Sequence, residues 1–115
     1  MSNVPFFATG KSFSIREWRG SGPPEMHVHH SDDEAWHVLE GELEFRYPDL
    51  TETAGPGDTV FVPAGRPHTY IAKPGARYLI ILTPCIAALI AALQTERDHS
   101  NHAEIYRQYE SELLE

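Results

Sequence analysis

Hydrophobic and polar residues alternate over short stretches in the first 82 positions of the chain. The clearest stretch is residues 42–47, where Leu43, Phe45 and Tyr47 are separated by charged residues. A period of two predicts a β-strand with one buried face. By the same pattern, together with short apolar runs, we expect further strands at residues 12–18, 25–30, 34–39, 59–62, 67–72 and 77–82.

Glycine and proline separate these stretches. The chain contains 8 Gly and 9 Pro, and nearly all of them precede residue 84. Many short strands divided by such residues are typical of an antiparallel sandwich or barrel, so we predict an all-β fold. Residues 1–10 are expected to form an irregular arm, and residues 48–58 a loop that ends in a turn.

The period changes after Thr83. Thr83 is a favourable N-cap and Pro84 a favourable first helical residue. Apolar residues then follow at helical spacing in two stripes, namely Ile86, Leu89, Ile90 and Leu93, and later Ile105, Tyr106, Tyr109 and Leu113. Asn101 and Glu104 resemble a capping box before the second stripe. We therefore predict one or two C-terminal helices that face the core or a second copy.

Composition narrows the classes of function. The 115 residues suit a single domain spanning residues 1–115, and 17 acidic against 9 basic side chains give a net charge of -8. This balance disfavours binding to nucleic acid or to an anionic membrane, because both need an excess of Lys and Arg. A single cysteine, Cys85, excludes an intramolecular disulfide and a Cys-based zinc site. The first residues lack the pattern of a secretory signal, so we expect a cytoplasmic protein.

Histidines are the candidate metal ligands. His27 and His29 lie two residues apart in a predicted strand and therefore point to one face. Glu34 opens the next strand, so a hairpin would return a carboxylate beside the two imidazoles. His30 and His37 have the opposite parity, and we expect them on the surface or in packing. His68 follows a stiff turn at residues 63–65 and enters another strand, which is one way to direct a side chain accurately.

These two segments resemble the paired motifs of the cupin superfamily. The first motif is matched by His27, His29, Glu34 and Gly41, and the second by Gly57, Pro63, Gly65 and His68. Two positions depart from the pattern. Ser21 stands where the family has glycine, and Ala72 stands where the second motif ends in asparagine.

The resemblance implies a jelly-roll barrel, or double-stranded β-helix, over about residues 11–83, followed by a helical segment at about 84–115. It also implies that His27, His29, Glu34 and His68 bind a metal. Three imidazoles and one carboxylate suit one divalent transition metal, which would be Fe, Mn, Ni, Cu, Co or Zn, and are too rich in nitrogen for Mg or Ca. Cupins are commonly dimers, so we expect a homodimer, for which Phe6, Phe7 and the helices offer apolar surface. The helices could instead cap the barrel.

Three functions fit this sequence. The first is a mononuclear metal-dependent dioxygenase that acts on a small organic molecule. The second is a non-enzymatic, metal-dependent module that binds or senses a small molecule, and the third is a sugar isomerase or epimerase. Trp36 and Tyr70 lie two residues after Glu34 and His68 respectively, so they either line a substrate pocket or fill the barrel.

Overall fold

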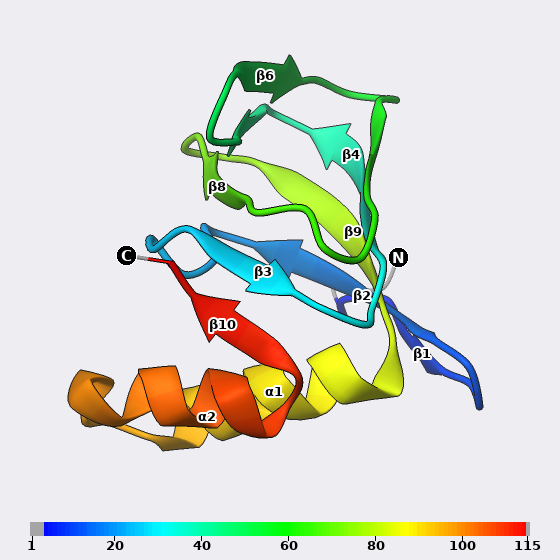
Figure 1. Cartoon of the computed structure of the whole chain (residues 1–115). Coiled ribbons are helices and arrows are strands. Elements are labelled where there is room, and N and C mark those ends of the chain that lie inside the picture. The colour runs from blue at the N-terminus through cyan, green and yellow to red at the C-terminus, as the bar shows by residue number, and fades with distance from the viewer. Residues whose placement is uncertain (1–3, 115) are drawn as a thin grey trace.

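Two antiparallel sheets face each other in the computed structural model, which describes residues 4–114 (Figure 1). The first sheet has five strands in the order β1-β2-β9-β4-β7. Their bounds are Phe7–Thr9 for β1, Ser14–Arg19 for β2, Arg77–Leu82 for β9, Glu34–Glu40 for β4 and Thr59–Val62 for β7. Strands β4 and β7 begin at the expected residues, because their alternating side chains pack against the same core.

The second sheet combines two hydrogen-bonded groups of strands. One group is β6 (Thr51–Ala54), β5 (Leu43–Arg46) and β8 (Thr69–Ala72), and the other is β10 (Ser111–Leu113) beside β3 (His27–His29). A bridge joins them, since the backbone N–H of His27 donates to His68 O at 3.0 Å and that of His68 donates to His27 O at 2.8 Å. The predicted all-β jelly-roll barrel is confirmed, and the bridge brings the two histidine motifs side by side.

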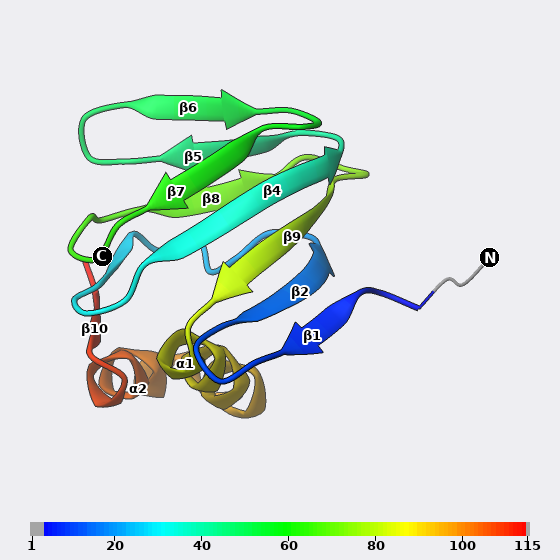
Figure 2. The same cartoon turned by 90° about the vertical axis from the view of Figure 1, so that its right-hand side faces the viewer.

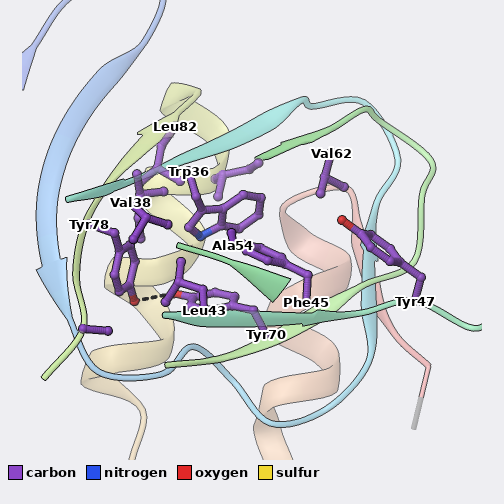
Figure 3. Packing of buried hydrophobic residues seen from close by; sticks show 13 residues of the cluster. Trp36, Val38, Leu43, Phe45, Tyr47, Ala54, Val62, Tyr70, Tyr78 and Leu82 are labelled. Atoms are coloured by element: carbon purple, nitrogen blue, oxygen red, sulfur yellow. Dashed lines mark hydrogen bonds between the residues drawn. The ribbon is translucent and has the colours of Figure 1, made fainter. Parts of the chain in front are cut away.

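The hydrophobic core lies between the two sheets (Figure 3). Trp36, Val38, Leu43, Phe45 and Tyr78 are all fully buried within it. The alternation that predicted residues 42–47 is confirmed, because Leu43, Phe45 and Tyr47 face this core whereas Arg46 is exposed. Trp36 and Phe45 meet edge to face, with ring centroids 4.9 Å apart.

The C-terminal helices lie together at one end of the barrel (Figures 1 and 2). The first, α1 (Pro84–Thr95), begins as predicted, since the Thr83 side chain accepts a hydrogen bond from the Ile86 N–H at 3.2 Å. Ile86 belongs to the same hydrophobic cluster as the strands, and Leu89 is also buried. A short 3-10 turn (His99–Asn101) leads to α2 (His102–Gln108). These contacts show that α1 caps the barrel.

The structure corrects the expectations for the ends of the chain. Residues 1–3 of the expected irregular arm lie outside the described residues, but Phe7–Thr9 form β1 because they pair in antiparallel register with β2. The second apolar stripe was predicted to be helical as far as Leu113, which is wrong. Glu110 has a φ of 55°, which ends the helical path and turns the chain into β10 beside β3.

Two further expectations are wrong in detail. The predicted loop at residues 48–58 contains β6, because Thr51–Ala54 pair with β5 along their whole length. Asn101 stands at the N-cap of α2 but its side chain makes no capping hydrogen bond, so there is no capping box. Asp98 caps the preceding turn instead, and accepts from the Ser100 N–H at 3.0 Å. No helix in residues 4–114 is long and apolar enough to cross a membrane.

Candidate metal centre

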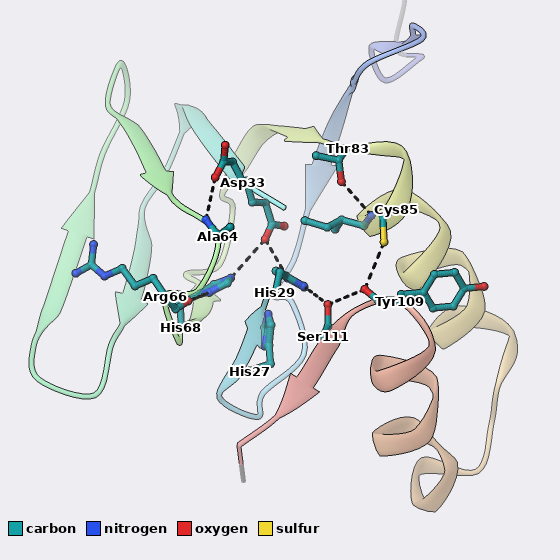
Figure 4. A network of polar contacts seen from close by, with 12 residues as sticks. His27, His29, Asp33, Ala64, Arg66, His68, Thr83, Cys85, Tyr109 and Ser111 are labelled. Atoms are coloured by element: carbon teal, nitrogen blue, oxygen red, sulfur yellow. Dashed lines mark hydrogen bonds and ion pairs between the residues drawn. The ribbon is translucent and has the colours of Figure 1, made fainter. Parts of the chain in front are cut away.

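Four ionisable side chains converge inside the barrel, and Figure 4 labels the three histidines among them. His27 and His29 both face inward from β3, Glu34 is the first residue of β4, and His68 immediately precedes β8. All four are buried, with His68 only 1% exposed and Glu34 only 7%. Ionisable groups are rarely buried to this extent unless they are paired or bind an ion.

Glu34 lies at short range from two of the histidines, and the three histidines lie close to one another. Glu34 Oε1 lies 3.3 Å from His29 Nε2 and 3.4 Å from His68 Nε2. The three histidines each offer a ring nitrogen, and these nitrogens lie within 4.8 Å of one another. The two distances from Glu34 match those between ligands around one ion with metal–ligand bonds of about 2.1 Å.

Backbone carbonyls fix the orientation of two of the imidazoles. His27 Nδ1 donates to Glu25 O at 3.0 Å, and His68 Nδ1 donates to Arg66 O at 3.0 Å. A carbonyl oxygen can only accept, so in both rings the proton resides on Nδ1. In the neutral imidazole, Nε2 then carries the lone pair that faces the cluster, which is the arrangement of a ring held for metal binding.

Ser111 performs the same task for His29. The Ser111 hydroxyl donates to Tyr109 O at 3.1 Å, and its Oγ lies 2.7 Å from His29 Nδ1. Because the hydroxyl proton is directed to Tyr109, Ser111 Oγ accepts the proton of His29 Nδ1. Sequence reasoning missed Ser111, which lies 82 residues from His29 and is brought there only by the pairing of β10 with β3.

Burial and neighbouring groups set the protonation of the cluster. Burial, with repulsion from His68 adding to it, lowers the pKa of His27 to about 4. Burial raises the pKa of Glu34, but hydrogen bonds and charge attraction from the His29 and His68 imidazoles, when these carry a proton on the nitrogen that faces Glu34, outweigh it and lower that pKa to about 2. At neutral pH His27 is therefore neutral and Glu34 is a carboxylate, and both are ready to act as ligands.

The donor set fits a divalent transition metal. Glu34 Oε1 and His68 Nε2 are buried and have no hydrogen-bond partner among the described residues. Electron pairs that face each other across 3.3 to 3.4 Å repel unless a proton or a metal ion lies between them. An ion bound to all four side chains would remove this repulsion. Three imidazole nitrogens with one carboxylate are suited to Fe, Mn, Ni, Cu, Co or Zn.

Contacts between turns hold the two histidine motifs in place. Asp33 Oδ1 accepts from the Ala64 N–H at 2.8 Å, which ties the turn before β4 to the turn after β7.

Gly41 has a φ of 76°, and a Cβ there would lie 2.6 Å from Ala76 Cα, so only glycine fits. Ser21 and Ala72, the two residues that differ from the cupin pattern, are in contact, because Ser21 Oγ accepts a hydrogen bond from the Ala72 N–H at 2.9 Å.

The other two histidines of the first segment lie outside the cluster. His30 is 52% exposed and its Nε2 is 3.4 Å from Glu112 Oε1. His37 points to the opposite face of β4 from Glu34, and its Nδ1 lies 2.8 Å from Thr59 Oγ1. The parity of each strand thus separates the inward-facing from the outward-facing histidines, as expected from the sequence.

Trp36 and Tyr70 fill the barrel and also border a cavity inside it. Both belong to the hydrophobic cluster, and both line a small inner cavity of about 40 Å³ beside His27, His29 and Glu34. Trp36 is 0% exposed, and its Nε1–H has no hydrogen-bond acceptor among the described residues. Tyr78 O–H donates to Gly20 O, so Tyr70 O–H donates to Tyr78 Oη at 2.9 Å.

A larger cavity adjoins the inner one. It has a volume of about 210 Å³ and is lined by β2, β9, α1 and the segment at residues 21–23. The two cavities share five lining residues, namely Pro23, Tyr70, Ile80, Ile90 and Leu93. Ile90 and Leu93 come from α1, so the helix that caps the barrel also forms the wall beside the candidate metal centre.

The comparisons with known proteins place the chain in a family. The model of the Cupin domain matches residues 15–82, which is more than half of the chain. The chain therefore belongs to the cupin family. The search of curated proteins found no match.

Solved structures with the same fold support this placement. A cupin-2 domain containing protein from Shewanella frigidimarina is 24% identical, with a TM-score of 0.59, covering 72% of this chain and 82% of that one. A cupin protein from Desulfovibrio desulfuricans, described as RmlC-like, is 25% identical, with a TM-score of 0.51 and coverage of 70% and 81%. KdgF from a Halomonas species is 19% identical, with a TM-score of 0.55 and coverage of 67% and 74%.

Proposed function

We propose that this cupin binds one divalent transition metal through His27, His29, Glu34 and His68 and acts as a dioxygenase on a small, largely apolar molecule. The observation that carries the proposal is the cluster itself. Four buried ligand groups converge, Glu34 Oε1 and His68 Nε2 among them have no hydrogen-bond partner in the described residues, and an apolar cavity adjoins the cluster.

The protein's part in the chemistry follows from these contacts. When bound, the metal supplies Lewis acidity and, if it is Fe or Mn, redox chemistry with O2 as co-substrate. Four protein ligands leave positions open on an ion that prefers six. Glu25 O, Arg66 O and Ser111 Oγ hold the three imidazoles in place, and His27, His29 and Glu34 line the inner cavity. The aromatic walls and α1 exclude bulk water from that side.

The lining of the inner cavity supports a substrate with an apolar body. Trp36, Ile80, Ile86 and Leu89 form its walls together with the cluster. A sugar carries a hydroxyl on nearly every carbon, and these walls would leave most of them unpaired, which is costly. The buried Trp36 Nε1–H would donate to one oxygen of the bound molecule. The lining therefore favours an oxygenase over a sugar isomerase.

We also propose that the chain forms a homodimer through the outer face of the five-stranded sheet. Strand register places Ile15, Ile81, Ala35 and Phe61 in one row across β2, β9, β4 and β7. Phe61 is 58% exposed, and nearby Phe13 is 52% exposed. An apolar row with two exposed aromatic rings, Phe13 and Phe61, is typical of an interaction surface. We further propose that the chain forms a single domain and is located in the cytoplasm. Its one cysteine, Cys85, is a free thiol, as is usual for cytoplasmic proteins.

Oxygen consumption tests the enzymatic part. The metal-free protein, loaded separately with Fe²⁺ and Mn²⁺, is mixed with flavonols, diketones and catechols while dissolved O2 is recorded. The proposal predicts uptake with at least one class, and none with the His68→Ala variant treated in the same way. Tight binding of a compound without oxygen uptake would favour the sensor function, and neither binding nor uptake would contradict both.

A further inference from the structure

The larger of the two adjoining cavities, which we call the outer cavity, is lined by one charged side chain. Most of the walls of this 210 Å³ space are apolar, but Arg16 of β2 contributes to them. Arg16 has the same parity as Ser14 and Trp18, so it lies on the inward-facing side of the strand. An arginine is unexpected at such a position, where side chains normally pack against the core.

Arg16 has no counter-ion of its own. No carboxylate in residues 4–114 lies within ion-pair distance of it, although the chain carries 17 acidic side chains against 9 basic ones. Arg77, on the adjacent strand β9, does have acidic partners, since it contacts Glu17 at 3.2 Å and Glu40 at 2.9 Å. Arg16 differs from the other basic side chains that lack an ion pair within residues 4–114 because it lines the outer cavity, so a molecule in that cavity could supply its partner.

Aromatic rings hold the guanidinium in place without using its hydrogen-bond donors. Arg16 Cζ lies 5.3 Å from the ring centroid of Phe7 and 5.4 Å from that of Trp18. Cation–π contacts involve the face of the guanidinium, and its five N–H groups lie along the edge. These donors stay available for a planar acceptor such as a carboxylate, which binds guanidinium through two parallel hydrogen bonds.

We propose that the outer cavity is the substrate chamber of the metal centre and that Arg16 binds a carboxylate of the substrate. The substrate class is then a small apolar acid, with an aromatic or short aliphatic body and one carboxylate. The body would extend past Tyr70 and Ile80, which line both cavities, toward the cluster of histidines. This inference rests on the proposed function for the role of the metal, but not for the binding of the acid.

The size of the chamber limits the molecule. About 210 Å³ is less than the roughly 300–1,000 Å³ of pockets that hold drug-sized ligands. Gly22 sets one wall, because a Cβ at this position would lie 2.6 Å from the Tyr70 ring. The geometry therefore suits acids of the size of benzoate, cinnamate or hexanoate.

Calorimetric titration tests the proposal with matched probes. Benzoate, cinnamate and hexanoate are compared with their neutral amides on wild-type protein, both metal-free and loaded with Zn²⁺. We expect at least one acid to bind at least tenfold more tightly than its amide. Arg16→Gln should weaken binding of that acid about tenfold or more and leave the amide unchanged, because a charge-assisted bidentate contact is lost. Arg16→Lys should restore part of the difference.

Two control variants separate this role from others. Arg19→Gln removes the same charge from the exposed, opposite face of β2 and should leave the affinity for the acid unchanged. Phe7→Ala removes one ring that supports Arg16 but retains the guanidinium, so the preference for acid over amide should persist. The proposal is overturned if no probe binds at millimolar concentration, if acids and amides bind equally, or if Arg19→Gln has the same effect as Arg16→Gln.

The two states of the protein distinguish this inference from the proposed function. If Zn²⁺ does not bind but the metal-free protein still prefers acids through Arg16, the metal proposal fails and the acid site stands. If Zn²⁺ binds at the histidine cluster but no acid preference depends on Arg16, the metal centre stands and this inference fails.

Discussion

The inner end of the barrel and the outer face of the five-stranded sheet are both unusual. The first buries charged or ionisable side chains where a protein core is normally apolar, and the second exposes aromatic side chains where a protein surface is normally polar. The inner end buries a carboxylate and three imidazoles, whereas the outer face exposes Phe13 and Phe61. Buried ionisable groups and exposed aromatic rings both cost free energy unless another species meets them. The comparison suggests two different partners, an ion inside and a second copy of the chain outside.

The two regions also differ in how strictly their side chains are held. Each imidazole of the inner cluster has a hydrogen-bond partner for its Nδ1, and two turns are tied together by Asp33 and Ala64. The outer row of Ile15, Ile81, Ala35 and Phe61 is defined only by strand register. Substitutions inside should therefore affect ion binding steeply, and substitutions outside should affect association more than folding.

The largest effect is expected from removing a ligand. His68→Ala should lower the affinity for Zn²⁺ or Co²⁺ by more than about 100-fold, because losing even a group that only supports a ligand costs about 10–100-fold. Competition with a chromophoric chelator measures the affinity. His37→Ala, on the outward face of β4, is the control and should bind the metal as the wild type does. Equal affinities in the two variants would contradict the assignment of His68.

Acid should destabilise the metal-free protein next most strongly. The unfolded chain protonates His27 below about pH 6.5, but the folded chain does so only below about 4, since burial lowers its pKa. Between these values acidification favours the unfolded state. We expect the free energy of unfolding to fall by about 2 kcal/mol from pH 7 to pH 5 through this group. Urea titrations at both values measure it, and His27→Gln should show a smaller fall. An unchanged pH dependence in the variant would count against the buried neutral imidazole.

A smaller effect is expected from the support of a ligand. Ser111→Ala leaves His29 Nδ1 without its acceptor and should reduce metal affinity about tenfold. Ser31→Ala is a matched control, because its hydroxyl is exposed and bonds to Glu110 Oε1 at 2.7 Å, away from the cluster. The same chelator competition applies to both variants. A Ser111→Ala protein that binds metal as tightly as Ser31→Ala would show that this hydrogen bond does not position His29.

The smallest effect on folding is expected on the outer face. Phe61→Ser should change the free energy of unfolding of the monomer by less than about 0.5 kcal/mol, since Phe61 is 58% exposed. The same substitution should shift the protein from dimer to monomer in sedimentation velocity at micromolar concentration. Glu44→Ser, on the outward face of the other sheet, should leave the dimer intact. A wild-type protein that sediments as a 13.0 kDa monomer would contradict the proposed dimer.

The elements that sequence patterning predicted are those that bury one face against the core. Strands β4 and β5 bury every second side chain, β9 was found by its apolar run, and α1 has both a cap and an apolar stripe. Strand β6 was missed because only Ala54 of its four residues is buried, so it has no apolar alternation. Strand β10 was missed because a positive φ at Glu110 is not encoded by a glycine.

The residues of the candidate site also fall into two groups, those that the sequence could predict and those that only the folded structure shows. His27, His29, Glu34 and His68 could be found because their spacing in two short segments is fixed by strand parity and a family pattern. Ser111 and Arg16 could not be found, since the first reaches His29 through the pairing of β10 with β3 and the second has meaning only beside α1. Long-range pairing and the absence of a counter-ion are properties of the folded chain rather than of a local motif.

The most direct test of the metal centre is anomalous diffraction from crystals of the protein loaded with Zn²⁺. The account predicts one strong peak per chain inside the barrel, at about 2.0–2.2 Å from Nε2 of His27, His29 and His68 and from a carboxylate oxygen of Glu34. A peak held by fewer of these side chains would revise the ligand set. No peak in the barrel, with Zn²⁺ present in excess, would contradict the account.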